Sequence, residues 1–197
     1  IQDVLPPELH KQFMGAIQDA LNSDKTIGIE YPLDIAGTNL WFDANVSKLN
    51  EDQVFWVARD ITDRKINELT QIAITQISES ALSSTTIDEL FTSIHEAIKP
   101  LLPTDNFYVA QYDSKINLIT FPYHVDEVDN DWAPRKLSRG LTSYVIRTGK
   151  PLRTTPEIFS DLEASGEIVS DGARSVDWLG VPLRSKQVVN GVIAIQT

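Results

Sequence analysis

The pattern of apolar and polar positions over the first 60 residues predicts one helix followed by three strands. Apolar residues recur at helical spacing between positions 9 and 21, behind two prolines that a helix accepts in its first turn. Turn residues then separate three strand-like runs, 26–33, 38–49 and 54–60. One helix and a three-stranded antiparallel meander are too few elements for a closed core, so we expect the front of this domain to lie outside the sequence.

The pattern changes to that of a helix between residues 61 and 83. Thr62 is a candidate N-cap, Asp63 lies in the first turn, and one apolar stripe follows, formed by Ile66, Leu69, Ala73, Ile77 and Ala81. The stripe contains alanine and no sustained leucine heptad, so a two-stranded coiled coil and a rigid spacer both stay open. In either case this segment connects two domains.

The remaining residues predict a second sheet with inserted helices. A capping box at 86–89 begins a helix that ends before Pro100. Strand patterns follow at 107–112, 118–123, 179–184 and 188–196, and the excursion between the two pairs holds helical patterns at 140–149 and 156–164. We therefore predict an α+β fold, with antiparallel sheets and helices packed on one face.

Composition and charge argue against two classes of function, nucleic-acid binding and membrane insertion. The net charge is −11 and the 17 basic residues are scattered, so no stripe of positive charge is available for direct nucleic-acid binding. No apolar segment has the length of a membrane span, and the N-terminus lacks a signal-peptide pattern. We expect no membrane in this fragment and a cytoplasmic location.

Candidate catalytic and metal-binding residues are scarce. The sequence has no cysteine, which excludes disulfides, thiolate metal sites and thiol nucleophiles. Its three histidines, His10, His95 and His124, share no metal-ligand spacing. Ser138 and Ser143 have no histidine at a recognisable spacing either. We expect no metal, no catalytic residues and no enzymatic activity in this chain.

Residues 1–60 resemble the C-terminal half of a PAS domain. The resemblance covers E-Y-P-L at 30–33 and W-F-D-A at 41–44, and its most specific part is D-I-T-D-R-K at 60–65. That hexapeptide is similar to the PAC-type exit from the last PAS strand into a signalling helix. The resemblance implies a broken PAS cofactor site, because the half that normally walls the pocket is missing.

Residues from about 70 onward resemble a GAF domain. The resemblance rests on R-G-L-T-S-Y-V-I-R-T-G-K-P-L at 139–152, W-L-G-V-P-L at 178–183 and G-V-I-A-I-Q at 191–196. The family usually adds a closing helix after that last strand. We therefore expect a PAS-like part at 1–60, a connector helix at 61–83 and a GAF-like sensor domain lacking its closing helix at 84–197.

The two resemblances imply the sensory region of a bacterial signalling protein, with an output domain of the histidine kinase or diguanylate cyclase type outside this chain. The absence of cysteine excludes an attached bilin and the thiol chemistry of the GAF-like methionine sulfoxide reductases. The N-K-x-F-x-D-E sequence of cyclic-nucleotide-binding GAF domains is also absent, which disfavours cyclic GMP. No cofactor can be identified from the sequence.

Aromatic and arginine residues suggest a small-molecule pocket in the GAF-like part, because this combination holds planar or anionic ligands. The candidate set is Phe107, Tyr123, Trp132, Arg139, Tyr144, Arg147 and Trp178. Arg135 lies in the same region. In the alternative interpretation the core is filled with side chains, and the domain serves only for dimerisation and signal relay. Under either interpretation we expect a homodimer formed through the connector helix.

Overall fold

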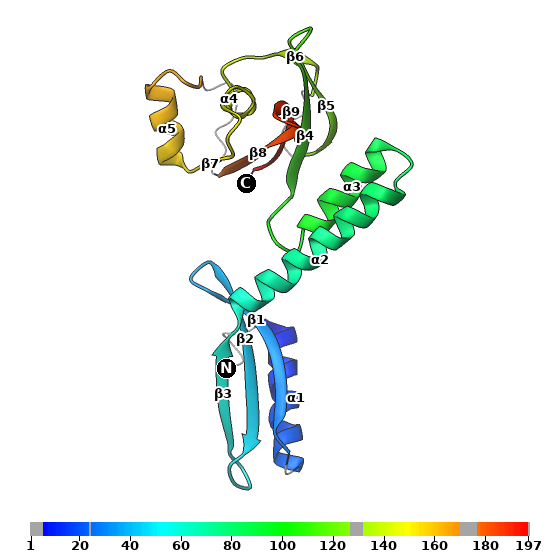
Figure 1. The fold of residues 1–197 in the computed structure, drawn as a ribbon. Coiled ribbons are helices and arrows are strands. Elements are labelled where there is room, and N and C mark those ends of the chain that lie inside the picture. The colour runs from blue at the N-terminus through cyan, green and yellow to red at the C-terminus, as the bar shows by residue number, and fades with distance from the viewer. Residues whose placement is uncertain (1–5, 24, 127–131, 170–176, 197) are drawn as a thin grey trace. The chain divides into compact units, whose positions relative to one another are not determined.

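The computed structural model describes residues 6–23, 25–126, 132–169 and 177–196. The chain forms two compact units, Ile1–Leu69 and Thr70–Thr197. The elements of both units are labelled in Figure 1. The boundary between the units falls inside one helix, α2 (Thr62–Ser83).

The first unit is a three-stranded antiparallel sheet with one helix on one face. Helix α1 (Pro7–Asn22) is followed by β1 (Ile27–Ile35), β2 (Thr38–Lys48) and β3 (Val54–Asp60), in the sheet order β1-β2-β3. Ala16 and Ala20 of α1 are buried against Val46 of β2. The helix and meander predicted for this segment are confirmed by these elements.

The junction between β3 and α2 is fixed by a short series of hydrogen bonds. The backbone N–H and the hydroxyl of Thr62 both donate to Asp60 Oδ1, at 2.8 and 2.6 Å. Thr62 Oγ1 in turn accepts from the backbone N–H of Trp41, at 2.9 Å. Thr62 is therefore the first residue of the helix and not its N-cap, which the sequence had suggested. Asp60 accepts the first N–H of the helix, and Thr62 links the first turn to β2.

An ion-pair network supports the same junction. Arg64 and Lys65 of α2 contact Glu30 of β1, both at 2.6 Å, and both contact Glu68 one turn later, at 2.7 and 3.3 Å. Lys65 and Arg64 hold the pKa of the Glu30 carboxyl below its ordinary value of 4.5 through hydrogen bonds to it. The charged form of Glu30 is therefore favoured by folding.

We expect the first unit to lose stability in acid partly through Glu30. Because the pKa of Glu30 is lowered by folding, its contribution is present above the ordinary value of 4.5 and is lost as the pH falls through the folded pKa. Urea unfolding between pH 3 and pH 7 should show a smaller decline for Glu30→Gln than for the unsubstituted chain. Glu51→Gln is the control, since Glu51 makes no ion pair within the described residues. Equal declines in all three proteins would contradict the prediction.

The second unit is built on a six-stranded antiparallel sheet in the order β6-β5-β4-β9-β8-β7. Its strands are β4 (Asn106–Asp113), β5 (Leu118–Val125), β6 (Arg135–Lys136), β7 (Leu152–Thr154), β8 (Trp178–Ser185) and β9 (Val188–Gln196). Helix α3 (Ile87–Ile98) precedes the sheet, and α4 (Leu141–Thr148) and α5 (Pro156–Ala164) lie in the excursion. The predicted capping box of α3 is confirmed at Thr86 and Glu89.

Helices cover both faces of this sheet. Phe107 and Val109 of β4 pack with Phe91 of α3, whereas the alternate residues Tyr108 and Ala110 pack in a second cluster that includes α4. The predicted α+β class with antiparallel sheets is confirmed. Helices lie on one face of the sheet in the first unit, as expected, but on both faces in the second. The reason is that β4 has apolar side chains on both sides, and each side has to be shielded from water.

Candidate ligand-binding site

A cavity of about 140 Å³ lies on the α4 face of the six-stranded sheet. Strands β4 and β5 form its floor, and the loop before α4 together with the first turn of that helix forms its polar wall. The described residues that line it are Tyr108, Ile119, Phe121, Trp132, Arg135, Ser138, Gly140, Thr142, Ser143 and Gln196. Tyr108, Ile119 and Ser143 are buried, so the inner end of the cavity is enclosed.

Three aromatic rings form the apolar wall. Trp132 lies 5.3 Å from both Tyr108 and Phe121 between ring centroids, and Tyr108 lies 5.9 Å from Phe121. The guanidinium of Arg135 lies over the Phe121 ring at 4.7 Å, and His124 stacks on Trp132 at 4.6 Å. Rings in such tilted arrangements give a rigid surface for a planar ligand.

Hydroxyl groups form the opposite wall and are linked to the core. Trp178 Nε1 donates to the Tyr108 hydroxyl at 3.1 Å, and this hydroxyl lies 2.8 Å from Thr142 Oγ1 in the first turn of α4. An indole N–H can only donate, so the Tyr108 oxygen accepts the first of these bonds. This chain fixes α4 against the sheet and places Thr142 at the cavity.

Two further hydroxyls belong to Ser138, in the loop before α4, and to Ser143, in the first turn of that helix. The Ser138 N–H donates to Ser143 Oγ at 3.0 Å, and the Gly140 N–H donates to Ser138 Oγ at 3.4 Å. Gly140 is the N-cap of α4 and has no side chain to cap it. These hydrogen bonds link the loop to the first turn of α4. In both of them a serine oxygen accepts from a backbone N–H group.

Arg147, a predicted ligand residue, links the loop before α4 to the segment that follows α5 by hydrogen bonds. Its guanidinium donates to the carbonyl oxygens of Ser138 and Glu167, at 2.7 and 2.8 Å, and lies 5.9 Å from the Tyr144 ring. Arg139 is exposed, and neither it nor Tyr144 lines the cavity within the described part of the chain. Arg147 therefore does not line the cavity. It stabilises the loop before α4, which forms the polar wall.

Of the candidate residues, the structure brings Trp132 to the cavity and places Phe107 and Tyr123 on the opposite, α3 face. Phe107 is fully buried there and stacks on His95 at 4.5 Å. His95 Nε2 donates to the Thr104 carbonyl at 2.9 Å, and its Nδ1 lies 3.0 Å from the Tyr123 hydroxyl. A carbonyl only accepts, so neutral His95 carries its proton on Nε2 and accepts from Tyr123.

We expect Tyr123→Phe to lower the free energy of unfolding of the second unit by about 1–3 kcal/mol, because it leaves a buried ring nitrogen without a donor. Urea denaturation monitored by circular dichroism measures the change. Tyr112→Phe is the control, since its hydroxyl donates to the exposed Asn117 side chain instead. If the two substitutions had equal effects, the Tyr123 hydroxyl would have no role in the core.

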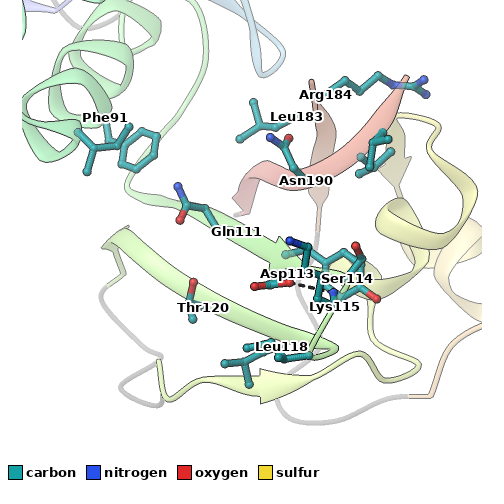
Figure 2. A pocket seen from close by; sticks show the side chains of 15 residues that line it. Phe91, Gln111, Asp113, Ser114, Lys115, Leu118, Thr120, Leu183, Arg184 and Asn190 are labelled. Atoms are coloured by element: carbon teal, nitrogen blue, oxygen red, sulfur yellow. Dashed lines mark hydrogen bonds between the residues drawn. The ribbon is translucent and has the colours of Figure 1, made fainter. Parts of the chain in front are cut away.

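A larger hollow on the α3 face is a groove with mostly exposed walls. Figure 2 shows side chains from α3, from the β4–β5 turn and from β8–β9 around it, including Phe91, Gln111 and Leu183. Its volume is about 790 Å³. Of its lining residues only Phe91 is buried, among those the structure describes. Small-molecule sites bury most of the ligand surface, so the smaller cavity on the α4 face is the better candidate.

Sequence reasoning missed Tyr108, Phe121 and Thr142 as cavity residues. Alternation along β5 could have placed Phe121 on the same face as Ile119, whereas no local signal marks Tyr108 of β4 or Thr142 of α4 as a cavity residue. Among the described residues, no three histidine, aspartate or glutamate side chains lie together as metal ligands would. No helix in that part of the chain is long and apolar enough to span a membrane.

Solved structures show which fold the chain contains. The GAF domain of A. aeolicus nlh2 in an inactive state matches 67% of this chain and 81% of its own, with 16% identity and a TM-score of 0.51. The GAF domain of an Acinetobacter phosphoenolpyruvate-protein phosphotransferase matches 66% and 77%, with 16% identity and a TM-score of 0.50. No family model and no curated protein sequence matches the chain.

The same fold occurs in an enzyme. The free methionine-R-sulfoxide reductase of Neisseria meningitidis, solved with its substrate, matches 68% of this chain and 75% of its own, with 14% identity and a TM-score of 0.52. A match of this extent has to include at least half of the second unit, since the first holds residues 1–69. The second unit therefore has a GAF-like fold, as the sequence motifs predicted.

Proposed function

We propose that this chain is a sensory and regulatory region of a bacterial signalling protein, whose GAF-like unit binds a small molecule. The observation that carries the proposal is the cavity on the α4 face, where Trp132 and Phe121 face a wall of hydroxyl groups with Arg135 beside them. Aromatic walls with a few polar groups are typical of small-molecule sites. Output chemistry, of the histidine kinase or diguanylate cyclase type, would lie in a domain outside this sequence.

The first unit is proposed to be the C-terminal half of a PAS domain, and α2 its signalling helix. Support comes from the junction at Asp60 and Thr62, which ties α2 to the sheet by hydrogen bonds. A helix held in this way can transmit a shift of the sheet along its axis. We place the chain in the cytoplasm, in keeping with its lack of cysteine.

A regulatory role is proposed in preference to catalysis. The GAF-like methionine sulfoxide reductases, whose fold the second unit shares, use thiol chemistry, and this chain has no cysteine. The serines at the cavity, Ser138 and Ser143, accept hydrogen bonds from backbone N–H groups and have no histidine beside them in the described cavity lining. An activated serine nucleophile needs such a base.

The second candidate function is dimerisation and relay without a ligand. Four large apolar side chains of α2 are half or more exposed, at 50% for Ile66, 53% for Ile72 and Ile74 and 91% for Leu82. A second copy of α2 that covers part of this apolar surface would form a parallel homodimer. The ligand site and the dimer are compatible, but only the first requires an accessible cavity.

Native mass spectrometry of the purified protein, followed by denaturation in the same session, tests both functions. A small molecule retained in stoichiometric amount and released on denaturation would support the sensor and give the ligand mass. A dimer with nothing bound would favour the relay function. A monomer with nothing bound would contradict both.

A further inference from the structure

A further pocket of about 240 Å³ lies where the connection between α3 and β4 meets strands β7, β8 and β9. It is separate from the groove on the α3 face, with which it shares no lining residue among those the structure describes. Its lining combines apolar side chains with one arginine and one aspartate. The residues are Leu102, Pro103, Arg153, Asp177, Trp178, Leu179, Ile195 and Gln196.

The register of the sheet explains how the walls of this pocket meet. A row of directly opposite residues crosses the neighbouring strands β4, β9, β8 and β7, and consists of Phe107, Ile195, Leu179 and Arg153. Directly opposite residues lie on the same face of a sheet, and Phe107 and Ile195 belong to the apolar cluster on the α3 face. Leu179 and Arg153 therefore lie on the α3 face as well, which places a guanidinium beside apolar side chains.

Arg153 and Asp177 are neighbours of opposite charge that do not pair. Asp177 directly precedes β8 and lines the pocket together with Leu179, two positions further on. Asp177 is therefore a diagonal neighbour of Arg153, and such neighbours lie about 7–8 Å apart, within reach of long side chains. Within the described residues, however, neither side chain makes a hydrogen bond or an ion pair. One free cation and one free anion are thus available to a ligand.

From these observations we propose that this pocket binds a free α-amino acid with an apolar side chain. The inference goes beyond the proposed function, because it assigns a second site on the other face of the sheet and needs no ligand in the α4-face cavity. An α-amino acid carries its ammonium and carboxylate groups on one carbon atom. The ammonium group can donate to the Asp177 carboxylate while the carboxylate accepts from the Arg153 guanidinium.

The size and the apolar walls of the pocket define the side chain of the ligand. An engineered apolar cavity of about 150 Å³ holds one benzene molecule, so a pocket of about 240 Å³ has room for a branched aliphatic side chain. Leu179 and Ile195 are partly buried, and a side chain placed against them would remove further apolar surface from water. A ligand with only one charge would leave either Arg153 or Asp177 without a partner beside this surface, which is unfavourable.

Matched probes that each lack one feature test the proposal. L-leucine is compared with 4-methylpentanoate, which lacks the ammonium group, with 3-methylbutylamine, which lacks the carboxylate, and with glycine, which lacks the side chain. Methyl NMR follows Leu179 and Ile195 in the pocket, and Ile29 of the first unit is the internal control. We expect L-leucine to bind at least about tenfold more tightly than each other probe, the effect of one lost charge-assisted bond or of the lost apolar contact.

Two substitutions assign the charges to their residues. Asp177→Asn should weaken L-leucine binding about tenfold and should not weaken 4-methylpentanoate binding, since that probe has no ammonium group. Arg153→Gln should weaken L-leucine binding to a similar extent and should not weaken 3-methylbutylamine binding. The matched controls are Asp161→Asn and Arg139→Gln, because both residues are exposed and neither lines the pocket in the described chain. A purely structural effect would weaken all probes alike.

The outcomes separate this site from the α4-face cavity. Saturable shifts at Ile195, with the crossed response of the two variants, would support the inference whether or not the α4-face cavity holds a ligand. Equal binding of L-leucine and the two singly charged probes, or no shift at Leu179 and Ile195 with any probe, would overturn it. A shift at Ile119 with none at Ile195 would place the amino acid in the α4-face cavity. The second site would then be wrong, whereas the proposed ligand-binding function would be supported.

Discussion

Replacement of Trp178 with alanine is expected to lower the free energy of unfolding of the second unit by about 3–5 kcal/mol, the range for aromatic side chains lost from a core. The ring is 2% exposed and packs over Gly180, where an added Cβ would lie 2.1 Å from the ring. Its N–H also donates to Tyr108, so the substitution leaves a void beside the hydrogen-bonded chain that holds α4.

Urea denaturation of the whole chain, followed by circular dichroism, measures the effect of Trp178→Ala. Trp178→Phe is the control, because it keeps an aromatic ring and loses only the N–H, at an expected cost of about 1 kcal/mol. A change below about 1 kcal/mol for the alanine variant would contradict the packing described for β8.

Replacement of Gly191 with alanine is expected to destabilise the second unit by about 3 kcal/mol, the upper part of the range for overpacking. A Cβ at this position of β9 would lie 2.4 Å from the backbone oxygen of Ala110 on β4. The clash is with main chain in the middle of a sheet, so no side-chain rotation relieves it. The effect comes from close approach of two strands and not from the backbone angle of the glycine.

Gly28→Ala is the matched control for this substitution. Gly28 also lies in a strand, β1, and its added Cβ would meet only the Asn45 side chain, at 3.9 Å. We expect a change within about 0.5 kcal/mol, as for other surface substitutions. Similar unfolding curves for Gly191→Ala and Gly28→Ala would show that β4 and β9 are not as close as described.

The elements of both units could be predicted from the sequence where local signals define them. The capping box at Thr86 and the exit at Asp60 and Thr62 depend on residues within three positions of one another, and the structure has both. The faces of the second sheet could not be predicted. Residues 107–110 of β4 are all buried, so no polar alternation marks which side faces α3.

The candidate site was predicted in part for the same reason. Trp132 was found because an aromatic residue beside arginines is a local signal. The sequence could not show that Phe107 lies on the other face of β4, or that Arg147 donates to carbonyl oxygens 9 and 20 positions away. Contacts at such separations depend on how the loops return to α4, which periodicity does not specify.

The measurement that tests the central claim most directly is the location of bound small molecules by methyl NMR. A fragment mixture containing acids, amides and amines would be added to protein labelled at isoleucine and leucine methyl groups. Ile119 lines the cavity on the α4 face, whereas Ile87 and Leu183 line the groove on the α3 face. We predict that the Ile119 signal shifts while those of Ile87 and Leu183 stay in place. Shifts at Ile87 and Leu183 with none at Ile119 would contradict the assignment of the α4-face cavity as the ligand site.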